Sequence, residues 1–181
     1  MLRTALVALL FASPAFAQDS AANALAAAGC GPSEVHFDVK TDKKQHPTAQ
    51  PDTGKALVYV IGDAWYDNVS VHIGTPPIRF GVDGAWIGAN GYKSYFFFPV
   101  EPGNHRLCTN VQSKHAGPIQ SSTAATSFTA EAGKTYYFRT ATSGKDKERS
   151  NLEELKLVPV DPAEAQVLIA AASFSTFHLR K

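Results

Sequence analysis

The sequence predicts a mainly β protein, an antiparallel β-sandwich with one C-terminal helix. Turn signals recur at roughly 8–12-residue intervals along most of the chain, as in sandwich folds. The segments between these turns are rich in β-branched and aromatic residues, which favour strands. Only the segment that begins at Asp161 combines the start signals of a helix with an apolar run. The 181 residues, of which 44% are hydrophobic, are enough for one globular domain with its own core.

The expected strands follow from two kinds of apolar pattern. Val35, Phe37 and Val39 alternate with polar residues, as in a strand with one buried face. Residues 57–61 form an unbroken apolar run, which is typical of a strand buried on both faces. Similar patterns predict further strands at residues 69–73, 79–82, 86–87, 92–100, 106–111, 126–130, 135–139 and 155–158.

Dipeptides that contain glycine mark the turns between these strands. Asp83-Gly84 predicts a two-residue hairpin, because both central positions of such a turn need positive φ. Asn90-Gly91 predicts a second turn of the same chemistry. Pro102-Gly103 predicts a type II turn, in which proline fixes φ at the second position and glycine takes the third.

The C-terminal helix begins at Asp161-Pro162-Ala163-Glu164. Aspartate can cap the first turn, proline suits the first helical position, and the glutamate completes a capping-box spacing. We expect Val167, Leu168 and Ala171 to pack on the sheet. Such cover is needed because Tyr95-Phe96-Phe97-Phe98 presents aromatic rings to both faces of its strand.

The N-terminal segment has the pattern of a secretory signal peptide spanning residues 1–17. A positive start precedes an apolar run at residues 5–12, and Ala15-Phe16-Ala17 is a small-x-small cleavage site. The apolar run is far shorter than the roughly 20 residues that a spanning helix needs, so we expect no transmembrane segment. Cleavage after Ala17 leaves Gln18, not cysteine, at the new N-terminus, which predicts an exported protein, periplasmic or secreted, that is not a lipoprotein.

The remaining chain divides into two parts. Residues 18–34 contain many small residues and are expected to form a flexible N-terminal tether, and residues 35–181 form a single β-sandwich domain with the C-terminal helix. An oxidising compartment favours a disulfide between Cys30 and Cys108, which would tie the tether to the sheet. The competing interpretation, a redox or metal pair, lacks the CxxC spacing that such pairs usually show.

Charge and motifs exclude several function classes. Seventeen basic and sixteen acidic residues give a net charge of +1, which predicts no nucleic-acid partner. No GxSxG motif, phosphate loop or dinucleotide-binding fingerprint is present, so no catalytic residue and no cofactor are predicted. None of the six histidines lies within four residues of another, and the acids lack calcium-loop spacing, so no metal site is predicted.

One segment combines aromatic and acidic residues and is the candidate binding site. Trp65 and Tyr66 stand between Asp63 and Asp67, and an exposed ring flanked by acids is suited to sugar stacking or peptide docking. Trp86 is a further candidate for the same surface. The alternative is that this aromatic loop is a lid over one end of the sandwich, because tryptophan is usually well buried.

The order of several short motifs resembles that of the bacterial exported domain family labelled domain of unknown function 2846 (DUF2846). The motifs lie at residues 54–60 (GKALVYV), 82–84 (VDG), 95 (Y), 100–105 (VEPGNH) and 132–137 (AGKTYY). The resemblance covers about residues 54–172 and extends more distantly to the surface modules called PEGA domains. It implies an envelope-associated β-sandwich with no known catalytic residues. Many relatives look like lipoproteins, whereas this chain has Gln18 at the position where the lipidated cysteine would stand.

The sequence therefore predicts a non-catalytic exported envelope or interaction protein. Its expected partner is an envelope protein or a cell-wall glycan. The alternative is a carbohydrate- or peptide-binding module that uses the aromatic loop, and a third hypothesis is a hydrolase with an unfamiliar site. The sequence leaves the ligand and the oligomeric state open.

Overall fold

The computed structural model describes residues 30–63, 76–112, 123–142 and 155–181. The expected signal peptide, the strand expected at residues 69–73 and the candidate residues Trp65, Tyr66 and Asp67 lie outside the described residues.

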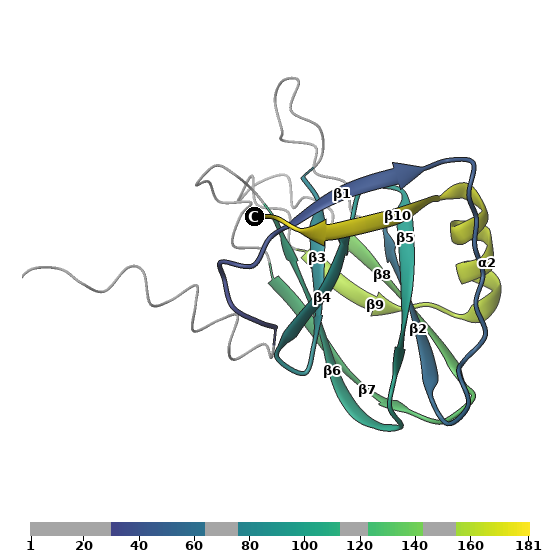
Figure 1. Ribbon diagram of the computed structural model, residues 1–181. Coiled ribbons are helices and arrows are strands. Elements are labelled where there is room, and N and C mark those ends of the chain that lie inside the picture. Colours follow the sequence, from purple (N-terminus) through teal and green to yellow (C-terminus); the bar gives the residue numbers. More distant parts are fainter. Residues whose placement is uncertain (1–29, 64–75, 113–122, 143–154) are drawn as a thin grey trace, which may run out of the picture.

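Two sheets face each other in a sandwich (Figure 1), which confirms the mainly β fold. The six-stranded sheet has the order β1 (Phe37–Asp42), β10 (Ser173–Leu179), β5 (Ser94–Val100), β2 (Ala56–Gly62), β8 (Thr135–Thr142) and β9 (Leu155–Pro159). The four-stranded sheet has the order β4 (Ala85–Asn90), β3 (Ile78–Val82), β6 (Gly103–Val111) and β7 (Thr123–Ala130). Most neighbours are antiparallel, but β10 pairs with β5, and β2 with β8, in parallel.

Strand β2 separates two apolar cores. Val58 and Val60 point into the interior of the sandwich, whereas Tyr59 and Ile61 point to the opposite face of the six-stranded sheet. All seven residues of β2 are buried, as the unbroken apolar run predicts. The neighbouring strand β5 follows the same rule, because Phe96 contributes to the interior core and Tyr95 to the outer one.

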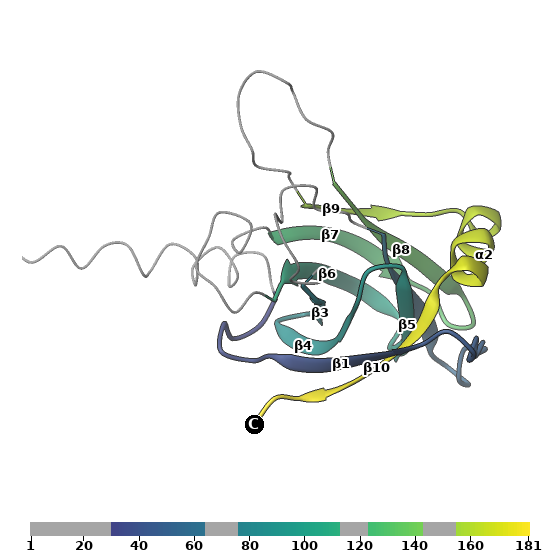
Figure 2. The same ribbon diagram turned by 90° about the horizontal axis from the view of Figure 1, so that it is seen from above.

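Helix α2 (Pro162–Ala171) packs on this outer face, at the right of the sheet in Figures 1 and 2. The side chain of Asp161 accepts hydrogen bonds from the backbone N–H groups of residues 163 and 164, so the expected N-cap is present. The packed side chains are not all those expected. Ala165 and Ile169 are buried, Leu168 is half-buried, and Val167 is 71% exposed. The helix is apolar on most sides, so its sequence does not specify which face packs.

The residues after α2 form strand β10, where no strand was predicted. β10 runs antiparallel to β1 and pairs with β5 through only two residues (Figure 1). Phe177 reaches back over the interior core, where its ring lies 4.8 Å from that of Phe96. Ser175 is buried, and its hydroxyl donates a hydrogen bond to the hydroxyl of Ser94 at 2.7 Å.

The expected turns are confirmed at one hairpin and displaced at another. Asp83 and Gly84 have φ values of 51° and 88°, so the β3–β4 hairpin has the predicted backbone. At the turn predicted for Asn90-Gly91, Asn90 is instead the buried last residue of β4. Its Nδ2 donates hydrogen bonds to the carbonyl oxygens of Val60 and Ser94. The positive φ, 49°, falls on Lys93.

Candidate functional site

Asp63 is the member of the aromatic loop that the structure describes. Its backbone N–H donates to the Thr140 hydroxyl at 3.1 Å, and its carboxylate lies 3.5 Å from Nη1 of Arg139. Arg139 also lies 3.6 Å from the carboxylate of Glu164 at the start of α2. Asp63 is therefore part of a half-exposed charge group beside the helix.

Trp86 lies on the four-stranded sheet, in the other layer, so the structure does not bring it together with Asp63. It packs against the disulfide-bonded residues Cys30 and Cys108, and its Nε1–H donates to the carbonyl oxygen of Pro32 at 2.7 Å. The guanidinium carbon of Arg79 lies 4.1 Å from the ring centroid. Trp86 is thus a contact for the segment that precedes β1.

The predicted disulfide between Cys30 and Cys108 is present, and both cysteines are fully buried. It joins two positions 78 residues apart and fixes the segment 30–36, called the arm below, to the centre of β6. The arm includes the last residues of the segment expected to be a flexible tether. Within the described residues, that segment is docked from Cys30 onward.

Arg79 is a charged residue that is almost completely buried. Its side chain is only 3% exposed, and its Nε and Nη2 groups both donate to the side-chain oxygen of Asn110 at 3.1 and 3.0 Å. Nη1 donates to the carbonyl oxygens of Ser33, at 3.0 Å, and Val35. These acceptors are all neutral, and burial lowers the pKa of Arg79 to about 10.

We call the disulfide, Arg79 and Trp86 together the arm clamp. Arg79 was not among the predicted site residues, although the alternation of its strand singles it out. In β3 it stands between Ile78 and Phe80, which both face the interior core, so the alternation of the strand places Arg79 on the opposite face. A cation at such a position needs acceptors from outside the sheet, and the arm supplies two of them.

Asp83 and His105, two residues of the motifs that resemble those of the DUF2846 family, meet at the β3–β4 hairpin. Asp83 accepts the backbone N–H of Arg106 at 2.8 Å through one carboxylate oxygen. Its other oxygen accepts Nδ1–H of His105 at 2.6 Å, and Nε2–H of His105 donates to the carbonyl oxygen of Glu101 at 2.6 Å. Both ring nitrogens therefore face acceptors, an arrangement that suits the doubly protonated ring.

The pKa values of this pair shift in opposite directions. Burial alone would lower the pKa of His105, but the hydrogen bonds to Asp83 and Glu101 and the charges of both acids outweigh it and raise the pKa. Burial would raise the pKa of Asp83, but the hydrogen bonds from Arg106 and His105 lower it overall. The imidazole thus links a hairpin to a strand end, and the raised pKa favours its cationic form.

The outer aromatic face of the six-stranded sheet is covered by the chain itself. Besides α2, residues 43–55 cross this face, where the Tyr59 hydroxyl accepts the backbone N–H of Ala49 at 2.8 Å. The Tyr95 hydroxyl donates to the carbonyl oxygen of Pro47 at 3.0 Å. Burial raises the pKa of both phenols. The aromatic run of β5 is therefore accounted for largely by internal packing.

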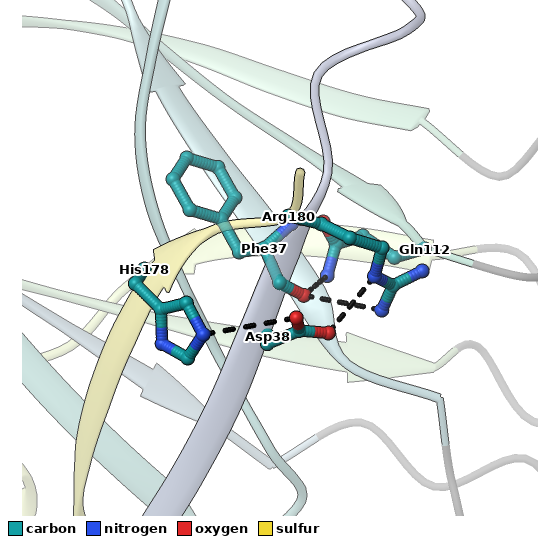
Figure 3. A network of polar contacts seen from close by, with 5 residues as sticks. All are labelled: Phe37, Asp38, Gln112, His178 and Arg180. Carbon is teal, nitrogen blue, oxygen red and sulfur yellow. Dashed lines mark hydrogen bonds and ion pairs between the residues drawn. The ribbon is translucent and has the colours of Figure 1, made fainter.

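A polar network joins β1 to the C-terminal end of the chain (Figure 3). The side-chain amide of Gln112 accepts the backbone N–H of Phe37 at 2.7 Å and donates to its carbonyl oxygen at 3.1 Å. Asp38 accepts Nε–H of Arg180 at 2.8 Å and lies 3.7 Å from Nε2 of His178. Gln112 thus pairs with β1 as a neighbouring strand would.

Across residues 30–63, 76–112, 123–142 and 155–181, no three His, Cys, Asp or Glu side chains gather in a way that could hold a metal ion. In that same part of the chain, no helix is long and apolar enough to cross a membrane.

Comparison with known protein families gives a match over the central part of the chain. The model of a family described as "Protein of unknown function (DUF2846)" matches residues 52–151, more than half of the chain. Neither the curated proteins nor the solved structures contain a match.

Proposed function

Since this chain belongs to the DUF2846 family of proteins of unknown function, we propose that it is a non-catalytic, exported interaction module of the cell envelope. Export is supported by the signal-peptide pattern of residues 1–17 and by the buried Cys30–Cys108 disulfide.

The observation that carries the non-catalytic part of the proposal is the geometry of His105. A general base needs a ring nitrogen that is free to accept a proton, and both nitrogens of this ring lie 2.6 Å from oxygen atoms of Asp83 and Glu101. Arg79 is similarly occupied by the arm and by Asn110. These side chains hold segments of the fold together, which is what a rigid scaffold for an interaction surface requires.

The proposed interaction with an envelope partner is tested by cross-linking the exported protein in intact envelopes. Three forms are compared: the natural chain, the variant Trp65→Ala with Tyr66→Ala, and a control with Val167→Ala and Leu179→Ala. The control removes two exposed apolar side chains far from the aromatic loop in sequence. We expect one cross-linked envelope protein with the natural chain and the control, and its loss in the loop variant. Equal cross-linking in all three forms, or none in any, contradicts a role for the loop.

The carbohydrate alternative is distinguished by a titration. Cell-wall glycan fragments are added to the protein while tryptophan fluorescence is followed. A saturable change that the loop variant loses would replace the protein partner with a glycan, because a sugar stacked on an indole ring changes the surroundings of that ring.

A further inference from the structure

Asn90 and Gly91 form the one Asn-Gly dipeptide of the sequence. In an unfolded chain this dipeptide is prone to deamidation, because glycine has no Cβ to keep its backbone nitrogen away from the preceding side chain. That nitrogen attacks Cγ of the asparagine, the N–Cγ bond forms, the Cγ–Nδ2 bond breaks, and the proton of the attacking N–H leaves with the side-chain nitrogen as ammonia. Water then opens the cyclic imide at either carbonyl, which yields aspartate or isoaspartate.

The fold holds the side chain of Asn90 away from this reaction. Its Nδ2 donates to the carbonyl oxygens of Val60 at 3.3 Å and Ser94 at 3.2 Å, so the amide is tied to β2 and β5. The backbone of Asn90 pairs with Ile78 of β3 and is extended there. Rotation of the amide toward the nitrogen of Gly91 would break both hydrogen bonds at a position that is 0% exposed, where water does not replace them.

The surroundings of Asn90 also oppose the chemical step. The attack places negative charge on Oδ1, and such an oxyanion is stabilised by donors that are aimed at it. Among the described residues no donor bonds to Oδ1 of Asn90, and this oxygen is buried. A Cβ at Gly62 would come within 2.8 Å of it, so the amide oxygen packs directly against the backbone of β2. The folded protein therefore gives the intermediate no stabilisation.

The products of deamidation do not fit the folded structure. An aspartate at position 90 would turn a carboxylate oxygen, in place of Nδ2, toward the carbonyl oxygens of Val60 and Ser94, which cannot donate. The position is fully buried, and a buried carboxylate without donors costs a large share of the stability of a domain. Isoaspartate instead lengthens the main chain at the end of β4. Either product removes the link that Asn90 makes between the two sheets.

We propose that Asn90-Gly91 is a modification site that becomes reactive only when the protein unfolds, and that its deamidation makes unfolding irreversible. The folded protein keeps the amide. In the unfolded chain the Gly91 nitrogen attacks, ammonia is lost, and the acid that forms prevents the return to the native fold. The site thus limits how long the chain survives in unfolded form. This inference does not depend on the proposed interaction with an envelope partner.

The shielding is tested on the full chain with its disulfide intact, incubated at one mildly alkaline pH in native buffer and in urea above the unfolding midpoint. Asn90 is the only asparagine in the tryptic peptide of residues 80–93, so mass spectrometry assigns the conversion of amide to acid in that peptide to Asn90. The free peptide, with and without urea, corrects for the effect of urea on the chemistry. We expect deamidation to be at least about tenfold slower in the folded protein, and a smaller difference would overturn the shielding.

The block on refolding is tested by diluting the urea after successive times and measuring the recovered native fraction by circular dichroism. The control Gly91→Ala keeps Asn90 and adds a Cβ beside the attacking nitrogen, with 3.4 Å to its closest neighbour. We expect the natural chain to lose its refoldable fraction in step with deamidation, and the control to keep it at least about tenfold longer. Refolding of chains whose Asn90 has deamidated, or a similar rate of loss in the control, would overturn the irreversible step.

Discussion

Replacing Asp83 and His105 tests whether the link between the β3–β4 hairpin and β6 is an ion pair. The variant Asp83→Asn keeps an oxygen for the backbone N–H of Arg106 and removes the charge, and asparagine tolerates the positive φ of this position. His105→Gln removes the cation. The side chain of His105 is 12% exposed and that of Asp83 is 48% exposed, so solvent screens the pair in part. A charged hydrogen bond contributes about 1.5–3 kcal/mol and an exposed ion pair about 0.2–1 kcal/mol, which places the coupling free energy near 1 kcal/mol.

The pH dependence of this coupling follows from the two pKa shifts. The pKa of His105 is raised above 6.5, so its contribution is fully present below 6.5 and is lost as the pH rises through the folded-state value. The pKa of Asp83 is lowered below 3.8, so its contribution is present above 3.8 and is lost as the pH falls through the folded-state value. The coupling free energy should therefore be largest between pH 3.8 and pH 6.5 and should disappear in alkaline solution.

Urea denaturation of the natural chain, both single variants and the double variant measures the coupling as a double-mutant cycle. We expect about 1 kcal/mol near pH 5.5 and close to zero near pH 9. A coupling of the same size at both pH values, or none at either, would refute the ion pair.

Two further predictions concern packing. A Cβ at Gly88 would overlap the ring of Phe177, so Gly88→Ala should lower the free energy of unfolding by about 1–3 kcal/mol in urea denaturation. At Gly91 the closest contact of a new Cβ is 3.4 Å, so the control Gly91→Ala should change the free energy of unfolding by less than about 0.5 kcal/mol. Equal effects of the two substitutions would contradict the packing of β10 on β4. Ile169→Ala should destabilise by about 2–5 kcal/mol and Val167→Ala by less than about 0.5 kcal/mol, and the reverse order in thermal denaturation would mean that α2 packs through the other face.

Much of the fold could be predicted because local chemistry and tertiary structure agree. The hairpin at Asp83-Gly84 needs two positive φ values, and the helix start needs a cap. Both are properties of a few neighbouring residues. The burial of β2 on both faces follows from its unbroken apolar run.

The errors occurred where distant contacts decide the structure. Asn90-Gly91 has turn chemistry, yet Asn90 is needed as a buried donor to a carbonyl oxygen of β2, so the turn moves to Lys93. No strand was predicted after the C-terminal helix, where Phe174 and Phe177 lie. The two rings belong to a strand that crosses from the outer core to the interior one.

The candidate site was predicted only in part for the same reason. The disulfide follows from the compartment and from the cysteine count, and it is present. Trp86 was predicted as a further candidate for the surface of the aromatic loop. Its contact with Pro32 of the arm joins residues 54 positions apart in sequence, and no local pattern carries that information. Its position beside the guanidinium of Arg79 depends on the pairing of β3 with β4.

The most direct test of an exported, disulfide-closed module is the intact mass of the protein from fractionated cells whose thiols were trapped by alkylation at lysis. An exported module predicts a protein in the envelope fraction or the medium, lacking residues 1–17, with neither Cys30 nor Cys108 alkylated. A full-length protein in the cytoplasmic fraction with both cysteines alkylated would contradict it.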